Sequence, residues 1–263
     1  MDLLFSANAG ILWPVCRFSY ERSSTLENVD KLYPKLTEAV RKDHIEFDMV
    51  ATGHDFDHTL QVKQTARVIA PDEYTGWIAS AAAICHNADR LLEKRRGDVG
   101  RKKVPECEVV AMVLRWLNAG ETFSEQEIVI ILRAVQKHSG PNLADGDLVL
   151  MTLQDADRVV CSMPDVIMCA TQFRPDLRAI HPKWLTCDPN NPTNPYRDPQ
   201  SVLHSMECWY DWADPNNSKF CVRLPRARVL MEENVAFLRM YIERIKTQRA
   251  KIDLYPDYPV ETA

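Results

Sequence analysis

Apolar residues recur every three to four positions along most of the chain, and no region shows the strict alternation of half-buried strands. The ranges with this helical spacing are 25–50, 58–69, 105–117, 124–137, 148–163, 201–212 and 225–250. Residues 74–92 add an apolar run, IASAAAIC at its densest, whose alanines favour a buried helix over a strand. We therefore expect an all-α fold built as a bundle of packed helices.

Two stretches interrupt this pattern. Residues 93–103 are charged and contain two glycines, which predicts an exposed loop, and residues 174–199 hold six of the 16 prolines, which predicts a large irregular loop. Ser124 followed by Glu127 predicts a capping box at the start of the helix over 124–137. The loop over 174–199 thus separates the helices before it from two C-terminal helices within 201–250.

Composition fits an ordinary globular protein. With 263 residues, of which 46% are hydrophobic and 26% charged, the chain is long enough to bury a full core, and we expect a single domain over 1–263. The formal net charge of −5 gives no overall attraction to phosphate backbones, so a DNA-binding role is not expected.

The eight cysteines form no CxxC pair, which argues against a zinc ribbon or a redox dithiol. Several lie in apolar runs such as AAAICH and RVVCSM, where free cysteine packs as a small hydrophobe. The first residues lack a basic segment typical of secretory signals, and no apolar run reaches the length of a membrane span. We expect a cytoplasmic protein without a membrane partner.

Four of the seven histidines lie in settings suited to a metal site. His54 and His58 occur in GHDFDHTLQV, His86 in AAAICHNADR, and His138 in ILRAVQKHSG. A further predicted helix carries LQDADRVV, with Asp155 and Asp157. Imidazole nitrogens and a carboxylate oxygen that converge from several core helices can bind a divalent cation. Taken singly, each is as readily a hydrogen-bonded core residue.

The ordered set of motifs resembles the HD-domain superfamily of metal-dependent phosphohydrolases, whose pattern is His, then His-Asp, then Asp on successive helices of a bundle. The resemblance covers about residues 53–160 and implies His58, His86, Asn87 and Asp157 as the metal-site residues. His54-Asp55 is not the doublet by chain order, because the family's doublet closes an alanine-rich helix, as His86 does; a helix-start role suits that pair.

The doublet departs from the family pattern at Asn87. An asparagine offers a neutral carbonyl oxygen and withdraws one negative charge from the site, which lowers the expected affinity for the cation. Asp89, three residues after His86, is a nearby carboxylate and a candidate to restore that charge. Asp157 is favoured over Asp155 as the last ligand, since residues two apart on a helix point in nearly opposite directions.

The resemblance implies one divalent cation (Mn, Co, Mg, Fe, Ni or Zn) and hydrolysis of a nucleotide or another small phosphorylated metabolite by a metal-bound water. The side chains expected to take part in catalysis are Asn87, His138, Arg90 and Arg158. The residues expected to bind the anionic substrate are Arg95, Arg96, Arg101, Lys102 and Lys103. That basic stretch is equally explained as a solvated turn.

Two other functions stay open at this point. Asn87 suggests a catalytically degenerate relative that binds a ligand or partner without turnover. An iron-dependent oxygenase is a second alternative, because the same fold hosts that chemistry, although only His138 supplies a further histidine between the doublet and Asp157. Fold alone does not decide among them.

Overall fold

The structure is a computed structural model that describes residues 31–49, 53–97, 104–143, 146–174 and 176–258. Internal contacts divide the chain after Leu32, and the description below concerns the unit Tyr33–Ala263. The all-α prediction is confirmed: within the described ranges the regular elements are all helices, and the only β-type pairing is an isolated bridge between His181 and Leu185. The prediction of one domain over 1–263 stays a prediction.

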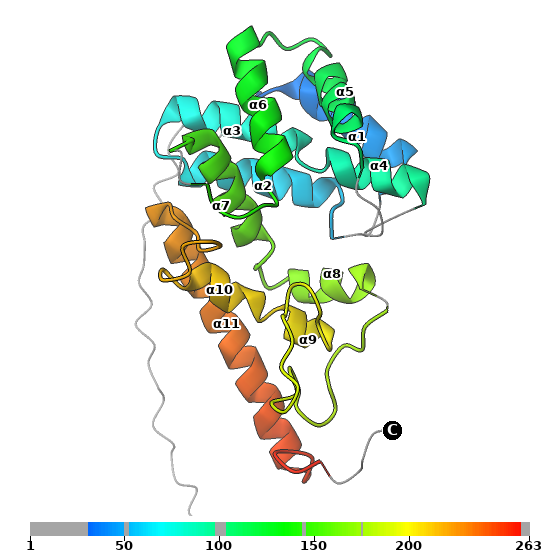
Figure 1. The fold of residues 1–263 in the computed structure, drawn as a ribbon, viewed down its shortest axis with the longest axis vertical. Helices are drawn as coiled ribbons and strands as arrows, with labels where there is room; N and C mark the ends of the chain where they lie inside the picture. The colour runs from blue at the N-terminus through cyan, green and yellow to red at the C-terminus, as the bar shows by residue number, and fades with distance from the viewer. Residues whose placement is uncertain (1–30, 50–52, 98–103, 144–145, 175, 259–263) are drawn as a thin grey trace, which may run out of the picture. The chain divides into compact units, whose positions relative to one another are not determined.

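Eleven helices are present among the described residues (Figure 1). They are α1 (Pro34–Glu46), α2 (Phe56–Ile69), α3 (Glu73–Cys85), α4 (Ala88–Arg96), α5 (Glu106–Leu117), α6 (Glu125–Lys137), α7 (Leu148–Val160), α8 (Val166–Phe173), α9 (Val202–Ser205), α10 (Cys208–Ala213) and α11 (Pro225–Ala250). In the part of the chain that the structure describes, no helix is both long and apolar enough to cross a membrane.

Helices α2, α3 and α7 form the centre of a bundle that α1, α4, α5 and α6 surround (Figure 1). The alanines of α3 explain this central position: Ala79, Ala81, Ala82 and Ala83 are completely buried, and their small side chains let neighbouring helices approach closely. The core continues through α7, whose Leu153 is also completely buried. The motif-bearing helices are therefore the most rigidly packed ones.

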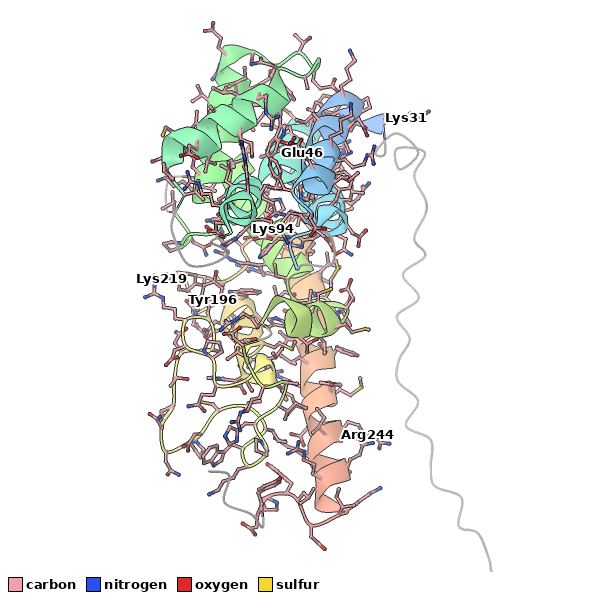
Figure 2. The ribbon with its side chains drawn as sticks, turned by 90° about the vertical axis from the view of Figure 1, so that its right-hand side faces the viewer. Lys31, Glu46, Lys94, Tyr196, Lys219 and Arg244 are labelled. Carbon is pink, nitrogen blue, oxygen red and sulfur yellow. The ribbon has the colours of Figure 1, made fainter. Side chains whose placement is uncertain are left out.

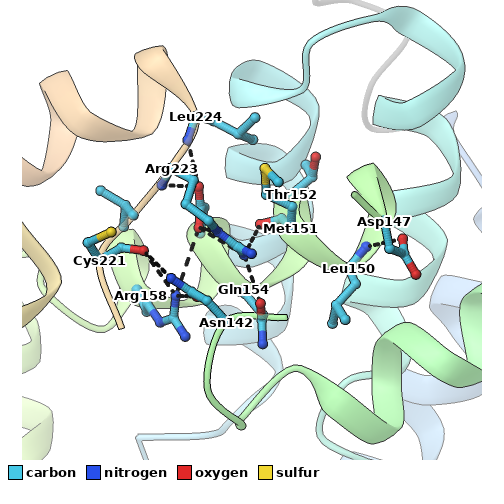
Figure 3. A network of polar contacts seen from close by, with 12 residues as sticks. Asn142, Asp147, Leu150, Met151, Thr152, Gln154, Arg158, Cys221, Arg223 and Leu224 are labelled. Atoms are coloured by element: carbon cyan, nitrogen blue, oxygen red, sulfur yellow. Dashed lines mark hydrogen bonds and ion pairs between the residues drawn. The ribbon is translucent and has the colours of Figure 1, made fainter. Parts of the chain in front are cut away.

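Helix α11 begins at Pro225, a residue suited to the first helical position, and contacts α10, α7 and α2. Its start is tied to α7 by a buried polar network (Figure 3). The carboxylate of Asp155, completely buried, accepts hydrogen bonds from the backbone N–H of Arg223 (2.6 Å) and of Leu224 (2.8 Å). The side chain of Arg223 donates to Gln154 Oε1 at 2.7 Å.

The predicted helices differ from the observed ones at their ends and in one interior break. The run 74–92 is two helices, α3 and α4, because the chain turns at His86 and Asn87. Part of 93–103 is helical rather than a loop: α4 continues to Arg96 and ends at Gly97, whose φ of 69° lies in the left-handed region that favours glycine. The range 201–212 is likewise two short helices, and α8 was not predicted.

Candidate metal centre

Three side chains from the central helices converge on one point. His58 lies in the first turn of α2, His86 follows the last residue of α3, and Asp157 lies in the second half of α7. His58 Nε2 is 3.2 Å from His86 Nε2 and 3.3 Å from Asp157 Oδ1, and His86 Nε2 is 3.8 Å from the same oxygen. The ordered set seen in the sequence is therefore a spatial cluster.

The local structure holds these groups in orientation. Asp55 is the N-cap of α2, and its side chain accepts a hydrogen bond from the backbone N–H of His58 at 2.9 Å, which fixes the first turn. His86 Nδ1 lies 2.6 Å from the carbonyl oxygen of Ala83. Because a carbonyl only accepts, the Nδ1 proton is placed there and Nε2 keeps its lone pair toward the cluster.

Charges in the cluster suit a cation. Burial lowers the pKa of His86 to about 3, although Asp157 opposes the shift, so the imidazole is neutral near pH 7. Burial alone would raise the pKa of Asp157, but the hydrogen bond from His58 and the electrostatic interactions with the neighbouring histidines outweigh it, so the pKa lies well below its usual value. Neutral imidazole and ionised carboxylate are the protonation states that metal ligands require.

The spacing also fits one ion. Bonds of about 2.0–2.1 Å in tetrahedral geometry separate nitrogen and oxygen donors by roughly 3.3–3.4 Å. The observed separations of 3.2, 3.3 and 3.8 Å bracket that value. The donor set of His58, His86 and Asp157 is therefore compatible with a divalent cation.

A fourth donor was missed in the sequence. The thiol of Cys161 lies 3.6 Å from Asp157 Oδ1, and the donor atoms of His58, Asp157 and Cys161 all lie within 4.8 Å of one another. Cys161 follows Asp157 by four residues and so lies one turn further along the same face. That spacing was the available signal, but an apolar context made the thiol look like a packing residue.

Asn87 is buried at the turn between α3 and α4, where its Nδ2 donates to Thr59 Oγ1 at 3.3 Å. The hydroxyl of Thr59 in turn donates to the carbonyl oxygen of Asp55 at 3.3 Å, so its oxygen is left to accept. An asparagine satisfies this arrangement, whereas an ionised aspartate has no proton to donate. Asn87 is thus tied to the first turn of α2, next to His58.

Asp155 and Asp157 have separate surroundings, as expected of residues two apart on a helix. Asp155 is tied to Arg223 and Leu224 at the start of α11, whereas Asp157 faces the histidines. Arg158 belongs to the first setting: its guanidinium donates to Asn142 Oδ1 at 2.6 Å and to the carbonyl oxygen of Gly140 at 3.1 Å (Figure 3).

His138 stands beside the cluster, with its ring centroid 5.3 Å from that of His86. Its Nδ1 lies 2.7 Å from the carbonyl oxygen of Val135, which leaves Nε2 as the basic nitrogen. Both histidines line a cavity of about 170 Å³. Its other polar or charged lining residues are Asp89, Glu93, Glu106, Gln136, Lys137 and Ser139.

The phenol of Tyr196 lies within electrostatic range of Arg90 and Asp157. Arg90 Nη1 is 3.0 Å from Glu93 Oε2. Tyr196 belongs to the proline-rich loop and is 62% exposed (Figure 2). Partial desolvation by the surrounding protein raises the pKa of its phenol, Arg90 lowers it and Asp157 raises it, so all three groups interact. No sequence signal linked Tyr196 to the motifs, because 38 residues and a loop separate it from Arg158.

Among the remaining predicted residues, Arg95 and Arg96 make their contacts with residues outside the cluster. Arg95 stacks on Phe47, with its Cζ 5.6 Å from the ring centroid, and Arg96 forms an ion pair with Glu108. Arg101, Lys102 and Lys103 lie outside the described residues. His54 contacts His58 edge-on, with ring centroids 5.5 Å apart. Substrate binding by the basic stretch stays a prediction.

The order of the helices and the place of the cluster define an HD-domain-like helical bundle. The fold is similar to that of Bacillus subtilis YpgQ in complex with ADP, with a TM-score of 0.51 and 18% identity over 81% of this chain and 96% of that chain. A structure of selenomethionine YpgQ gives a TM-score of 0.49 and 16% identity over 81% and 95%. No protein-family model and no curated protein matches the chain.

Proposed function

We propose that the protein is a metal-dependent phosphohydrolase that acts on a nucleotide or another small phosphorylated metabolite. The observation that carries the proposal is the convergence of the side chains of His58, His86 and Asp157, with His86 also lining a cavity. A divalent cation held there supplies Lewis acidity toward a phosphoryl oxygen and makes a coordinated water more acidic. Manganese, cobalt, magnesium, iron, nickel and zinc all remain within the proposal.

The side chains around the cation site have distinct parts in this proposal. His138 Nε2 accepts a proton or a hydrogen bond from water, since the Nδ1 proton is engaged with the carbonyl oxygen of Val135. Arg90 contacts the phosphate from the side of Tyr196, although its pairing with Glu93 must loosen for a bidentate contact. Arg158 is not included, because its guanidinium is engaged with Asn142 and Gly140.

Charge in the cavity supports metal dependence. Asp89, Glu93 and Glu106 face it against Lys137, so an anionic phosphate enters favourably only together with a cation. The volume of about 170 Å³ is smaller than pockets that enclose a whole ligand, roughly 300–1,000 Å³. The cavity therefore encloses the phosphate end, and the rest of a nucleotide extends toward the exposed Tyr196. The ADP complex of YpgQ makes ADP the first ligand to test.

The test measures bound metal and phosphate release together. Metal-free protein is loaded with Mn²⁺, Co²⁺ or Mg²⁺, bound metal is counted per chain, and release of phosphate from ADP and other nucleotides is followed. We expect about one ion per chain and metal-dependent release, both lost in His58→Ala and Asp157→Ala. His181→Ala, at a partly exposed histidine in the loop over 174–199, serves as the matched control and keeps both.

A second function rests on Asn87, whose amide is used to hold Thr59 and whose side chain brings no charge. In that case the protein binds the ligand without turnover, and ADP raises the melting temperature while no phosphate appears. Asn87→Asp adds the missing carboxylate and is expected to raise affinity for the cation. Oxygen consumption by iron-loaded protein would instead support the oxygenase. If the protein neither binds a nucleotide nor releases phosphate, the phosphohydrolase proposal is refuted.

A further inference from the structure

The cluster contains a donor that the motifs do not predict, the thiol of Cys161. It lacks the carboxylate that they require, because Asn87 stands in its place. Asn87 removes a negative charge at the end of α3, and Cys161 offers a thiol at the end of α7. Each position lies beside one of two neighbouring candidate ligands. Asn87 bonds to Thr59, next to His58, and Cys161 contacts Asp157. The two departures from an ordinary site of oxygen and nitrogen donors thus meet at one centre.

We propose that the Cys161 thiolate is a ligand of the cation, replaces the charge that Asn87 does not supply, and gives the site a preference for Zn²⁺ or Co²⁺ over Mg²⁺ or Mn²⁺. This inference rests on the metal site of the proposed function and names the class of cation that it binds. When the ion binds, the S–H bond breaks, the sulfur electron pair forms the bond to the metal, and the proton passes to solvent.

Distances support a sulfur ligand. With bonds of about 2.3 Å to sulfur and 2.0 Å to oxygen, tetrahedral geometry separates the two donors by roughly 3.5 Å. The observed distance from Cys161 Sγ to Asp157 Oδ1 is 3.6 Å, and His58 completes the group within 4.8 Å. In the metal-free chain this contact is an S–H donor to the carboxylate, and ligation replaces that hydrogen bond.

Donor chemistry determines which ions are preferred. Thiolate is a soft ligand that favours zinc and similar ions, whereas magnesium and manganese favour oxygen donors and water. Two imidazoles, one carboxylate and one thiolate are a donor set within the range that zinc accepts. With four protein ligands, a water or a phosphoryl oxygen would join as a fifth ligand, an expansion that zinc tolerates.

The experiment uses Co²⁺ as a spectroscopic probe on the full chain under reducing conditions. We expect the wild type to bind about one Co²⁺ per chain and to show a near-ultraviolet band of sulfur-to-cobalt charge transfer. Cys161→Ser keeps bound Co²⁺ but loses the band, and Cys221→Ser, a change at another buried cysteine outside the cluster, keeps both. In competition, the ratio of bound Zn²⁺ to Mn²⁺ falls about tenfold or more in Cys161→Ser.

The wild-type spectrum tests for a sulfur ligand even if Cys161→Ser fails to fold. Co²⁺ that binds in a His58-dependent manner without a sulfur band overturns the role of Cys161 and leaves the proposed function standing. Failure of the wild type to bind Co²⁺ or any other divalent ion overturns both. An unchanged ratio of Zn²⁺ to Mn²⁺ in a folded Cys161→Ser overturns the stated preference.

Discussion

Asp155 and Asp157 provide a matched pair, because two carboxylates on one helix have opposite predicted roles. Asp155→Ala leaves the backbone N–H groups of Arg223 and Leu224 without their acceptor and removes the carboxylate 3.9 Å from the buried Arg158 guanidinium. Asp157→Ala removes a proposed cation ligand and the acceptor of the hydrogen bonds from His58 and from the Cys161 thiol. We expect the first change to lower stability and the second to abolish metal binding.

The loss of stability caused by each substitution depends on the polar groups that it leaves without a partner. Desolvation raises the pKa of Asp155 in spite of its hydrogen bonds, so the carboxylate itself is not a large net source of stability. The cost of Asp155→Ala arises from the partners left behind: the N–H groups of Arg223 and Leu224 at ~1–3 kcal/mol each give about 2–6 kcal/mol, a range that includes the ~3–5 kcal/mol typical of breaking a buried ion pair. For a chain of this size that lowers the melting temperature by on the order of 10 °C.

Thermal unfolding in chelating buffer, followed by the same measurement with Zn²⁺ or Co²⁺, separates the two roles. Wild type and Asp155→Ala gain stability on adding the ion, whereas Asp157→Ala does not, and its metal-free melting temperature falls by less than half as much. Asp155→Asn, which keeps one oxygen acceptor, gives an intermediate loss if the alanine variant does not fold. The reasoning is refuted if Asp157→Ala keeps the metal-dependent gain while Asp155→Ala loses it.

Three further changes test separate parts of the structure. His138→Gln is expected to keep bound metal and lower the turnover rate about 100-fold, measured by phosphate release; an unchanged rate would remove His138 from the mechanism. Tyr196→Ala is expected to raise KM for a nucleotide about tenfold, equivalent to ~1.4 kcal/mol, with a small change in kcat. A fall in kcat alone would contradict that contact. Ser124→Ala breaks the capping box of α6 and costs ~1 kcal/mol in urea unfolding, and an unshifted midpoint would show that the cap is dispensable.

Helices whose ends depend on local chemistry were predictable from the sequence. The capping box of Ser124 and Glu127 is formed, and α11 begins at Pro225 and ends at Ala250 as predicted. The break at His86 and Asn87 was not predictable from the pattern, because the apolar residues continue on both sides of it. At that turn the side chain of His86 bonds to the carbonyl oxygen of Ala83 in the last turn of α3, a local contact, whereas Asn87 bonds to Thr59 in α2, a tertiary contact.

The candidate site was predictable where it depended on an ordered set of motifs and not where it depended on the path of a loop. His58, His86 and Asp157 lie together as the pattern implied. Cys161 was within reach of the helical spacing, since it is one turn from Asp157, whereas the position of Tyr196 depends on the irregular segment over 174–199. Sequence periodicity carries no information about where such a segment returns to the bundle.

The candidate metal cluster is built from packed helices, whereas Tyr196 comes from a loop. The proposed cation ligands lie on or directly after α2, α3 and α7, the central helices, whose packing holds donor atoms within a narrow range of separations. Tyr196 instead comes from a loop, where a change of sequence alters side-chain position at little cost to the core. Changes near Tyr196 should therefore alter which substrate is bound and leave metal content unchanged, whereas changes at Asp157 or Cys161 should alter the bound ion for every substrate alike.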